Sequence, residues 1–529
     1  MLLLRTLESK INIFLNKPIL SLTLIGTISL ILRLVYLPFD IPIILDGLDY
    51  FWYASDISFL KGFPPEYSIG NSGWPIFLSA IFSFFEFDNF LNYMNLQRHV
   101  TIFLSIATII PVYFICKRFF DKSYAIIGAS LFAFDPRIIQ NSLLGITDPL
   151  YIILSAISFC LFFTKQKKFF YLSFIVAAFA AFVRSEGIFI FAAFTVIFFV
   201  MHKKESRKIK TFLIASGVYL STLLPVIFWR IQNNGTDLIS GRILVESNNV
   251  FVQYSSDQGW IGLVNYATHA IGNSIQLGGW SLIPVFILFI PFGIYFSFKQ
   301  KDSELKYILL LIFILLIPVF FAFSIASDVR YIFYTFPLFC LVSLLGIKGI
   351  KNKLKVKNTF FILILGGVLI SSITFLEIKS IDNEYQKEVF EIGKEIINKT
   401  DAINDFYPQS AFLEPAAMPE KWPVLKSSFQ IETIRDDNNR AVIETSYDSK
   451  IHIFNTENYS SIKQFIKNNK NNGLTHIVVD NYEKRSAFLK EVYFHDENYP
   501  YLEKIFDSEQ AVFSKYHLKI YKINYSTFN

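Results

Sequence analysis

The chain has 529 residues, of which 53% are hydrophobic and 17% aromatic, whereas only 17% are charged. Because about a quarter of the residues in soluble domains are charged, this composition excludes an ordinary soluble protein and indicates an integral membrane protein. The formal net charge of +6 does not indicate a nucleic-acid partner, since the basic residues form short clusters between apolar segments, where membrane topology explains them.

Apolar segments predict about eleven membrane-spanning helices, because about 20 apolar residues are needed to cross the hydrocarbon core. In chain order they cover residues 19–37, 98–116, 123–140, 146–163, 168–183, 186–201, 210–229, 279–298, 307–325, 330–347 and 358–376. Clusters of lysine and arginine occupy alternate connections, which we place in the cytoplasm. With a cytoplasmic N-terminus, the long first connection (38–97) and everything after residue 376 then lie outside the cytosol.

The two long outer segments differ in character. Within the first, the apolar stretch 74–87 is too short to span, and we expect an interfacial helix there. After residue 376 the sequence becomes polar, with an amphipathic helix at 382–401. Further helices are expected at 459–470 and 484–505, and strands at 441–447, 450–455, 474–480 and 516–523. We therefore predict an α-helical polytopic membrane domain (1–376) and an extracytoplasmic α/β domain (377–529).

Ionisable residues stand close to the outer ends of several predicted spans. They are Asp46, Asp49, Asp148, Arg184, Glu186, Asp328 and Arg330. An ionisable group at membrane depth costs at least ~2.5 kcal/mol, so such groups usually face a water-filled cavity or one another. We therefore predict that these residues converge in one outward-facing pocket. The alternative is that each carboxylate only caps a helix or pairs locally, as Asp148 before Pro149 would.

The residue types in this group suit a particular chemistry. Asp46 and Asp49 share a helix face, and Tyr50 and Tyr53 repeat the spacing, although tyrosines here also fit an interfacial aromatic belt. A carboxylate at the mouth of a pocket can take a proton from an acceptor hydroxyl as a general base. An arginine guanidinium matches the geometry of a phosphate.

Five short motifs resemble those of multispanning glycosyltransferases that use polyprenyl-phosphate-linked sugars, of the protein O-mannosyltransferase and aminoarabinose transferase kind. The motifs are "DYFWYA" (49–54), Gly73-Trp74-Pro75, "TDPLY" (147–151), "RSEG" (184–187) and "RYIFYTFPLF" (330–339). The resemblance covers about residues 19–350 and implies inverting transfer of a sugar from a polyprenyl- or dolichyl-phosphate donor. The acceptor is a protein, a lipid or another glycan outside the cytosol, and the protein resides in the cell membrane.

The resemblance also implies roles for individual residues. Asp49 is the catalytic base, and Arg330 and Arg184 contact the donor phosphate. Some family members have a second acid directly after the catalytic one, whereas this chain has Tyr50, so Asp46 is the candidate helper acid. The remaining residues expected to support the site are Asp148, Glu186, Asp328 and Tyr53.

Three further readings follow from the same residues. Related oligosaccharyltransferases carry a WWDYG signature that residues 377–529 lack, so transfer of a whole oligosaccharide is disfavoured. A divalent metal held by Asp46, Asp49 and either His99 or His269 is an alternative to metal-free catalysis. A multispan lipid or sugar transporter is the rival function; it predicts charges in the middle of spans and often internal repeats, and we find no repeat.

Overall fold

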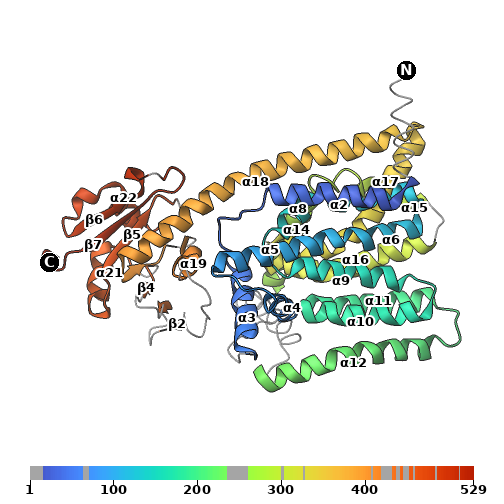
Figure 1. Ribbon diagram of the computed structural model, residues 1–529, viewed down its shortest axis with the longest axis horizontal. Helices are drawn as coiled ribbons and strands as arrows, with labels where there is room; N and C mark the ends of the chain where they lie inside the picture. Colours follow the sequence, from blue (N-terminus) through green and yellow to red (C-terminus); the bar gives the residue numbers. More distant parts are fainter. Residues whose placement is uncertain are drawn as a thin grey trace. The chain divides into compact units, whose positions relative to one another are not determined.

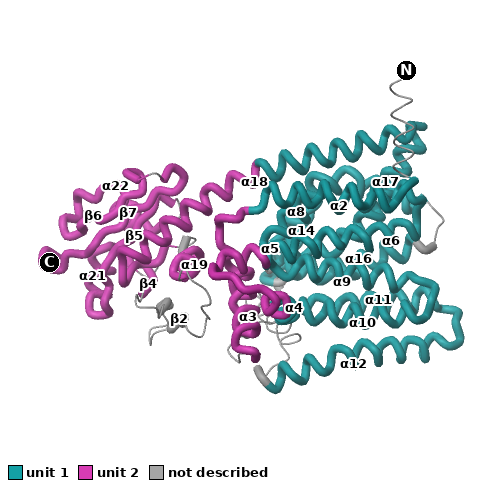
Figure 2. The backbone as a smooth tube through the Cα atoms, in the orientation of Figure 1, with its two compact units in different colours: residues 1–37, 64–78, 97–377 teal, residues 38–63, 79–96, 378–529 magenta. Residues whose placement is uncertain are grey.

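The computed structural model describes residues 16–63, 71–234, 260–299, 303–325, 328–406, 409–418, 432–435, 441–444, 452–456, 459–482, 485–511 and 513–528. By its internal contacts the chain divides into two units (Figure 2). Unit 1 comprises residues 1–37, 64–78 and 97–377, and unit 2 comprises residues 38–63, 79–96 and 378–529. The predicted division at 376/377 assigned the whole first outer connection to the membrane domain, whereas the contacts group most of that connection with the C-terminal region.

Unit 1 is built from apolar helices that lie side by side (Figure 1). They are α2 (Pro18–Val35), α5 (Phe90–Ala107), α6 (Ile109–Phe119), α7 (Lys122–Ala133), α8 (Pro136–Ser142), α9 (Asp148–Phe162), α10 (Lys167–Val183), α11 (Ile188–Met201), α12 (Lys208–Asn234), α14 (Trp260–Leu282), α15 (Ile290–Lys299), α16 (Ser303–Ile325), α17 (Phe336–Leu354) and α18 (Thr359–Lys399). Two short 3-10 helices, η1 (Ser185–Gly187) and η2 (Val329–Thr335), precede α11 and α17.

The helical membrane fold expected from the composition is confirmed. Within the described part of the chain, six helical segments are long and apolar enough to cross a membrane: Pro18–Val35, Phe90–Phe119, Lys208–Gln232, Leu305–Ser324, Val329–Leu354 and Thr359–Lys399. Shorter apolar helices such as α9 and α10 coincide with other predicted spans. The total of about eleven spans stays a prediction.

One predicted span is wrong. The segment 279–298 was expected to form a single helix after an outer connection at 230–278. Instead α14 occupies part of that connection and ends at Leu282, and α15 starts only at Ile290. Averaged hydropathy missed α14 because polar residues such as Asn265, Asn273 and Gln276 interrupt its apolar ones. The helix packs against α16. The hydroxyl groups of Tyr266 and Ser324 form a hydrogen bond of 2.7 Å across this contact.

Helix α18 joins two elements that were predicted separately, the last span (358–376) and the amphipathic helix (382–401). It runs without interruption for 41 residues, and its sequence contains neither proline nor glycine between Val368 and Ile392. Because those two residue types are the main helix breakers, nothing in this stretch ends the helix after the apolar part. Its C-terminal half belongs to unit 2.

Unit 2 contains the strands. Strand β1 (Ala402–Asn404) pairs in parallel with β4 (His452–Phe454), and β2 (Glu432–Arg435) pairs antiparallel with β3 (Ala441–Glu444). A third, antiparallel sheet has the order β5-β7-β6. Its strands are β5 (His476–Asp480), β6 (Leu502–Asp507) and β7 (Leu518–Ile523). The side chain of Asn404 extends the pairing to β5, since its Nδ2 donates to the Val478 carbonyl at 2.8 Å and its Oδ1 accepts from the Val478 N–H at 2.7 Å.

Helices α21 (Ile462–Asn469) and α22 (Ala487–Phe494) pack on this sheet around a core that includes Phe465, Ile477 and Val492. The predicted α/β pattern is confirmed at β3, β4, β5, β7 and α21. The helix predicted over 484–505 is wrong beyond Phe494, because β6 begins at Leu502. Pro500 disfavours helical geometry at Tyr499, which explains why the helix stops before it.

Two short helices lie in the first outer connection. Helix α4 (Gly73–Phe82) corresponds to the stretch that was expected to form an interfacial helix. Helix α3 (Asp46–Leu60) lies in unit 2 and begins after Leu45, which has φ 55° and ψ −138°. Most of its middle, including Phe51, Trp52 and Ala54, is completely buried.

Candidate active site

A cluster of charged residues lies in unit 1, where the ends of α9 and α10 meet. Arg184 follows α10 and donates from Nη1 to Asp148 Oδ1 at 2.6 Å and from Nη2 to Glu186 Oε1 at 3.0 Å. The Arg184 side chain is 10% exposed and that of Asp148 only 4%. The guanidinium is therefore held between two carboxylates in a largely buried place, where ion pairing is stronger than at the surface.

The turn "RSEG" produces this geometry. Arg184 has extended backbone angles (φ −141°, ψ 132°), so α10 ends there and the chain turns through η1 into α11. A Cβ on Gly187 would lie 2.4 Å from the Ala181 nitrogen, closer than real Cβ contacts. Only glycine fits where the turn folds back on α10, and this tight fold brings Glu186 beside Arg184.

A second ion pair lies in η2. Asp328 accepts from Arg330 Nε at 2.6 Å and from the Arg330 backbone N–H at 2.9 Å. The Arg330 side chain is 28% exposed, so its guanidinium is more accessible than that of Arg184. Helix η2 packs against α9, and the ring of its Tyr331 lies 5.2 Å from the Arg184 guanidinium.

The structure thus gathers Asp148, Arg184, Glu186, Asp328 and Arg330 within unit 1, with three carboxylates and two guanidinium groups. Asp148 Oδ2 and the hydroxyl of Tyr151, one helical turn further along α9, are buried and have no hydrogen-bond partner among the described residues. The Tyr151 ring lies 5.2 Å from that of Tyr334. Buried polar atoms without partners are costly, and at a functional site they indicate a ligand or water that completes the bonding.

The other predicted residues lie on α3 in unit 2. Asp46 is the first residue of the helix and Asp49 lies in its first turn, and both are exposed. Tyr53, four residues after Asp49, is buried. Asp56, which was not predicted as a site residue, lies one turn beyond Tyr53 and is only 1% exposed. The spacing of 49, 53 and 56 places an acid at each end of one helix face.

Two buried arginines in unit 1 were also missed. Arg33 in α2 is completely buried and donates from Nε to Ser142 Oγ at 3.0 Å and from Nη2 to Ser105 Oγ at 2.9 Å. Arg230 in α12 donates from Nη2 to Ser72 Oγ at 2.7 Å and to the Phe182 carbonyl at 3.3 Å. Arg33 stands inside the predicted span 19–37, and Arg230 directly follows the predicted span 210–229. An arginine at such a position is itself a signal, because a charge at membrane depth requires partners.

The hydrogen bonds of Arg230 give the Gly73-Trp74-Pro75 motif a structural role. It ties Ser72 to the end of α10, the helix that leads into Arg184. A Cβ on Gly73 would lie 2.8 Å from the Phe182 carbonyl oxygen, so the backbone passes too close there for another residue type. The contact fixes the part of the outer connection that belongs to unit 1.

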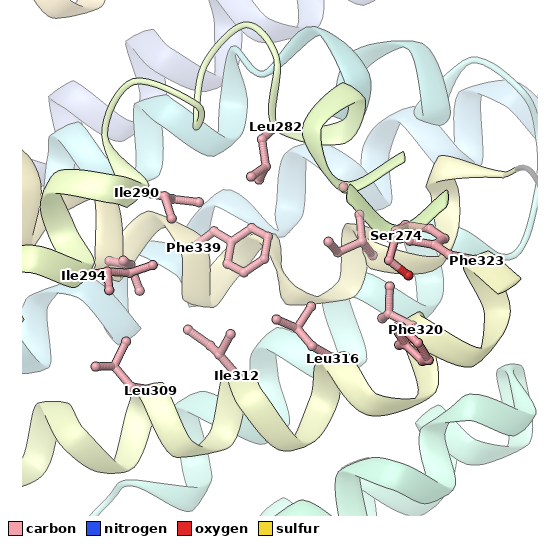
Figure 3. A pocket seen from close by; sticks show the side chains of 14 residues that line it. Ser274, Leu282, Ile290, Ile294, Leu309, Ile312, Leu316, Phe320, Phe323 and Phe339 are labelled. Atoms are coloured by element: carbon pink, nitrogen blue, oxygen red, sulfur yellow. The ribbon is translucent and has the colours of Figure 1, made fainter. Parts of the chain in front are cut away.

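An apolar pocket of about 350 Å³ lies between α14, α15, α16 and α17 (Figure 3). Leu309, Ile312 and Leu316 of α16 face Leu282, Ile290 and Phe339 across it. Its lining also includes Ile332 of η2, two residues after Arg330. Almost all of the lining is hydrocarbon, so the pocket suits an apolar chain whose polar end lies near η2.

Metal ligands do not gather in the described part of the chain: no group of three or more His, Cys, Asp or Glu side chains there is close enough to hold an ion. The metal alternative built on Asp46, Asp49 and a histidine stays open to a direct biochemical test.

Comparison with known proteins supports the resemblance seen in the sequence. Residues 90–229, about a quarter of the chain, match the family model described as dolichyl-phosphate-mannose-protein mannosyltransferase. This segment contains Asp148, Arg184 and Glu186 but neither α3 nor Arg330. No curated protein sequence matches the chain.

Two solved structures of the oligosaccharyltransferase from Archaeoglobus fulgidus share the fold. The apo form superposes with a TM-score of 0.54 at 13% identity, over 88% of this chain and 69% of that chain. The complex with zinc and sulfate has a TM-score of 0.52 at 14% identity, over 87% and 68%. ArnT from Cupriavidus metallidurans bound to undecaprenyl phosphate has a TM-score of 0.49 at 11% identity, over 96% and 98%.

These comparisons confirm the predicted resemblance to glycosyltransferases that use polyprenyl-phosphate donors and the predicted multi-pass membrane fold. They support a membrane glycosyltransferase and give no support to the transporter alternative.

Proposed function

We propose that this protein is a membrane glycosyltransferase that moves one sugar from a polyprenyl-phosphate carrier to a hydroxyl group on the extracytoplasmic side. The observation that carries this proposal is the charged cluster of α9, η1 and η2 next to an apolar pocket. A lipid-linked sugar phosphate needs both features, an apolar site for its tail and cationic groups for its phosphate. The orientation, with a cytoplasmic N-terminus and unit 2 outside, rests on the distribution of lysine and arginine.

The donor phosphate is assigned first to Arg330. Its guanidinium is 28% exposed, and Ile332 in the same 3-10 helix lines the apolar pocket. Arg184, the second predicted phosphate contact, already bonds two carboxylates. Its larger role in this proposal is to orient Asp148 and Glu186, with the phosphate as a weaker additional partner.

The proposed reaction is a single displacement with inversion. The acceptor hydroxyl oxygen attacks the anomeric carbon while the bond from that carbon to the phosphate oxygen breaks. Asp49 accepts the hydroxyl proton as general base, and the polyprenyl phosphate leaves with the bonding electrons. Asp46, in the same helical turn, is proposed to raise the basicity of Asp49 through the negative charge it adds nearby. The remaining acids position the donor.

The first donor and acceptor to test are a polyprenyl-phosphate hexose and a protein hydroxyl, because the matching family model is described by mannose and protein. A pentose donor and a lipid or glycan acceptor remain the alternatives. Transfer of a whole oligosaccharide is disfavoured, because residues 377–529 lack the WWDYG signature.

Asp49→Asn tests the proposal in the full-length protein reconstituted in lipid nanodiscs with radiolabelled donor. Loss of a general base is expected to lower transfer by about 100-fold to 10,000-fold. The matched control is Asp40→Asn, an exposed acid of the same connection whose ion pair with Lys387 measures 2.8 Å. Undiminished transfer by folded Asp49→Asn enzyme would reject the assignment. Movement of intact donor across the bilayer without sugar transfer by the wild-type protein would replace it with transport.

A further inference from the structure

A hydrogen bond ties α3 to a segment of unit 2 that is distant in the sequence. Trp52 in α3 is completely buried, and its Nε1 donates to Glu414 Oε1 at 2.6 Å. The two residues lie 362 positions apart in the chain. A hydrogen bond from a ring N–H to a carboxylate is short and strong, because the acceptor carries a charge.

Glu414 lies in a well-packed segment of unit 2. It belongs to α19 (Leu413–Ala416), whose Leu413 is buried together with the preceding Phe412. A Cβ on Gly393 of α18 would lie 3.2 Å from the Ala416 Cβ, so α19 packs closely on α18. The carboxylate is therefore presented from a fixed position.

Trp52 lies within one helical turn of Asp49 on α3. Asp49 and Trp52 are three residues apart, so they are neighbours on the helix surface, and a rotation of α3 that moves one moves the other. The chain enters α3 through a strained backbone conformation. Leu45 has a left-handed φ of 55°, which is unfavourable for leucine, and its side chain is 63% exposed. Such a conformation persists only when the surrounding structure enforces it.

We propose that Glu414 is a positioning residue for the transferase reaction: through Trp52 it fixes the rotation of α3 and thereby the direction of the Asp49 carboxylate. This inference rests on the proposed role of Asp49. It assigns a task in catalysis to residues 413–416, which lie far outside the segment matched by the family model. It also means that the C-terminal region acts on the chemical step and not only on docking of the acceptor.

Two single variants remove the bond from opposite sides. Trp52→Phe keeps an aromatic ring beside Phe51, whose centroid lies 5.6 Å away, but removes the N–H donor. Glu414→Ala removes the acceptor, and Glu414→Gln keeps a neutral acceptor of the same size. The matched control is Glu391→Gln, a partly exposed acid of unit 2 whose bond to Lys394 measures 2.9 Å.

The assay is sugar transfer by the full-length protein in nanodiscs, measured over donor concentrations up to saturation and normalised to folded protein by size exclusion and thermal melting. Trp52→Phe and Glu414→Ala are each expected to lower kcat by about 10-fold to 100-fold, as for loss of a charged hydrogen bond. KM for the donor is expected to stay unchanged, and Glu414→Gln is expected to lose less. The double variant is expected to be no slower than the slower single variant, because both break the same bond.

Wild-type kcat in both single variants would overturn the proposal, as would a double variant whose loss is the product of the two single losses. A loss of activity that disappears after normalisation to folded protein would reduce the bond to a structural one and also overturn it. If Glu414→Ala does not fold, Glu414→Gln and Trp52→Phe decide by the same criteria. Asp49→Asn separates the two claims: an inactive Asp49→Asn beside active Trp52→Phe and Glu414→Ala variants refutes only the positioning role.

Discussion

Replacing Arg184 by methionine is expected to destabilise unit 1 far more than the same change at Arg330. Methionine preserves much of the side-chain length but removes the charge. At position 184 the change leaves the Asp148 carboxylate, whose side chain is 4% exposed, without the guanidinium 2.6 Å away. Breaking a buried pair by removing one partner costs about 3–5 kcal/mol, because an uncompensated charge stays buried.

The Arg330 pair supplies the internal comparison. Its side chains are 28% and 29% exposed, and pairs in contact with solvent contribute about 0–1 kcal/mol. Arg330→Met is therefore expected to leave the free energy of unfolding nearly unchanged and to raise KM for the donor instead. Equilibrium unfolding in mixed SDS micelles measures the first quantity, and initial rates measured over a range of donor concentrations give the second.

A compensating variant checks the cause. Asp148→Asn combined with Arg184→Met removes both partners of the buried bond, so the double variant is expected to recover part of the stability lost by Arg184→Met. Wild-type stability in Arg184→Met, or equal losses at positions 184 and 330, would refute the reasoning that burial makes the first pair essential.

Three further predictions concern unit 2, the pocket and the metal alternative. Partial burial raises the pKa of the Glu388 carboxyl, but hydrogen bonds from the backbone N–H groups of Ser514, Lys515 and Tyr516 lower it more, so the pKa lies below the ordinary value of 4.5. The resulting stabilisation is complete above pH 4.5 and is lost as pH falls through the lowered pKa. Hydrogen exchange of residues 514–516 measures this acid dependence, and Glu388→Gln is expected to flatten it. An unchanged exchange profile in the variant would contradict the prediction. Leu316→Trp, which fills the pocket, is expected to raise KM about 10-fold for a long-chain donor but not for a donor with a two-isoprene tail. The control Ile317→Trp, on the exposed face of α16, is expected to leave KM for both donors unchanged. Equal effects of the two variants would show that the pocket does not bind the donor. Transfer is expected to survive EDTA, since the proposed step needs only a carboxylate base; activity lost in EDTA and restored by Mn²⁺ or Mg²⁺ would favour the metal alternative.

Local sequence patterns determined much of the architecture. The apolar segments located most helices of unit 1, because the need to match the hydrocarbon core acts on each segment separately. The same holds for strands such as β5, whose short apolar segment is visible in the sequence. The predicted site residues followed from topology, since alternate basic connections identify which span ends lie on the outer side.

Only the tertiary structure decided the partners. That Asp148 bonds Arg184, 36 residues away, depends on how α9 packs against α10, and no local pattern encodes that contact. Helix α14 was missed because its polar residues lower the averaged hydropathy, and its packing against α16 is a tertiary contact that no local pattern encodes. The buried bond from Trp52 to Glu414 joins segments 362 residues apart, and its existence depends on the folding of unit 2 as a whole. Periodicity and composition act over a few turns of chain, whereas the pairing of buried charges is set by which helices meet.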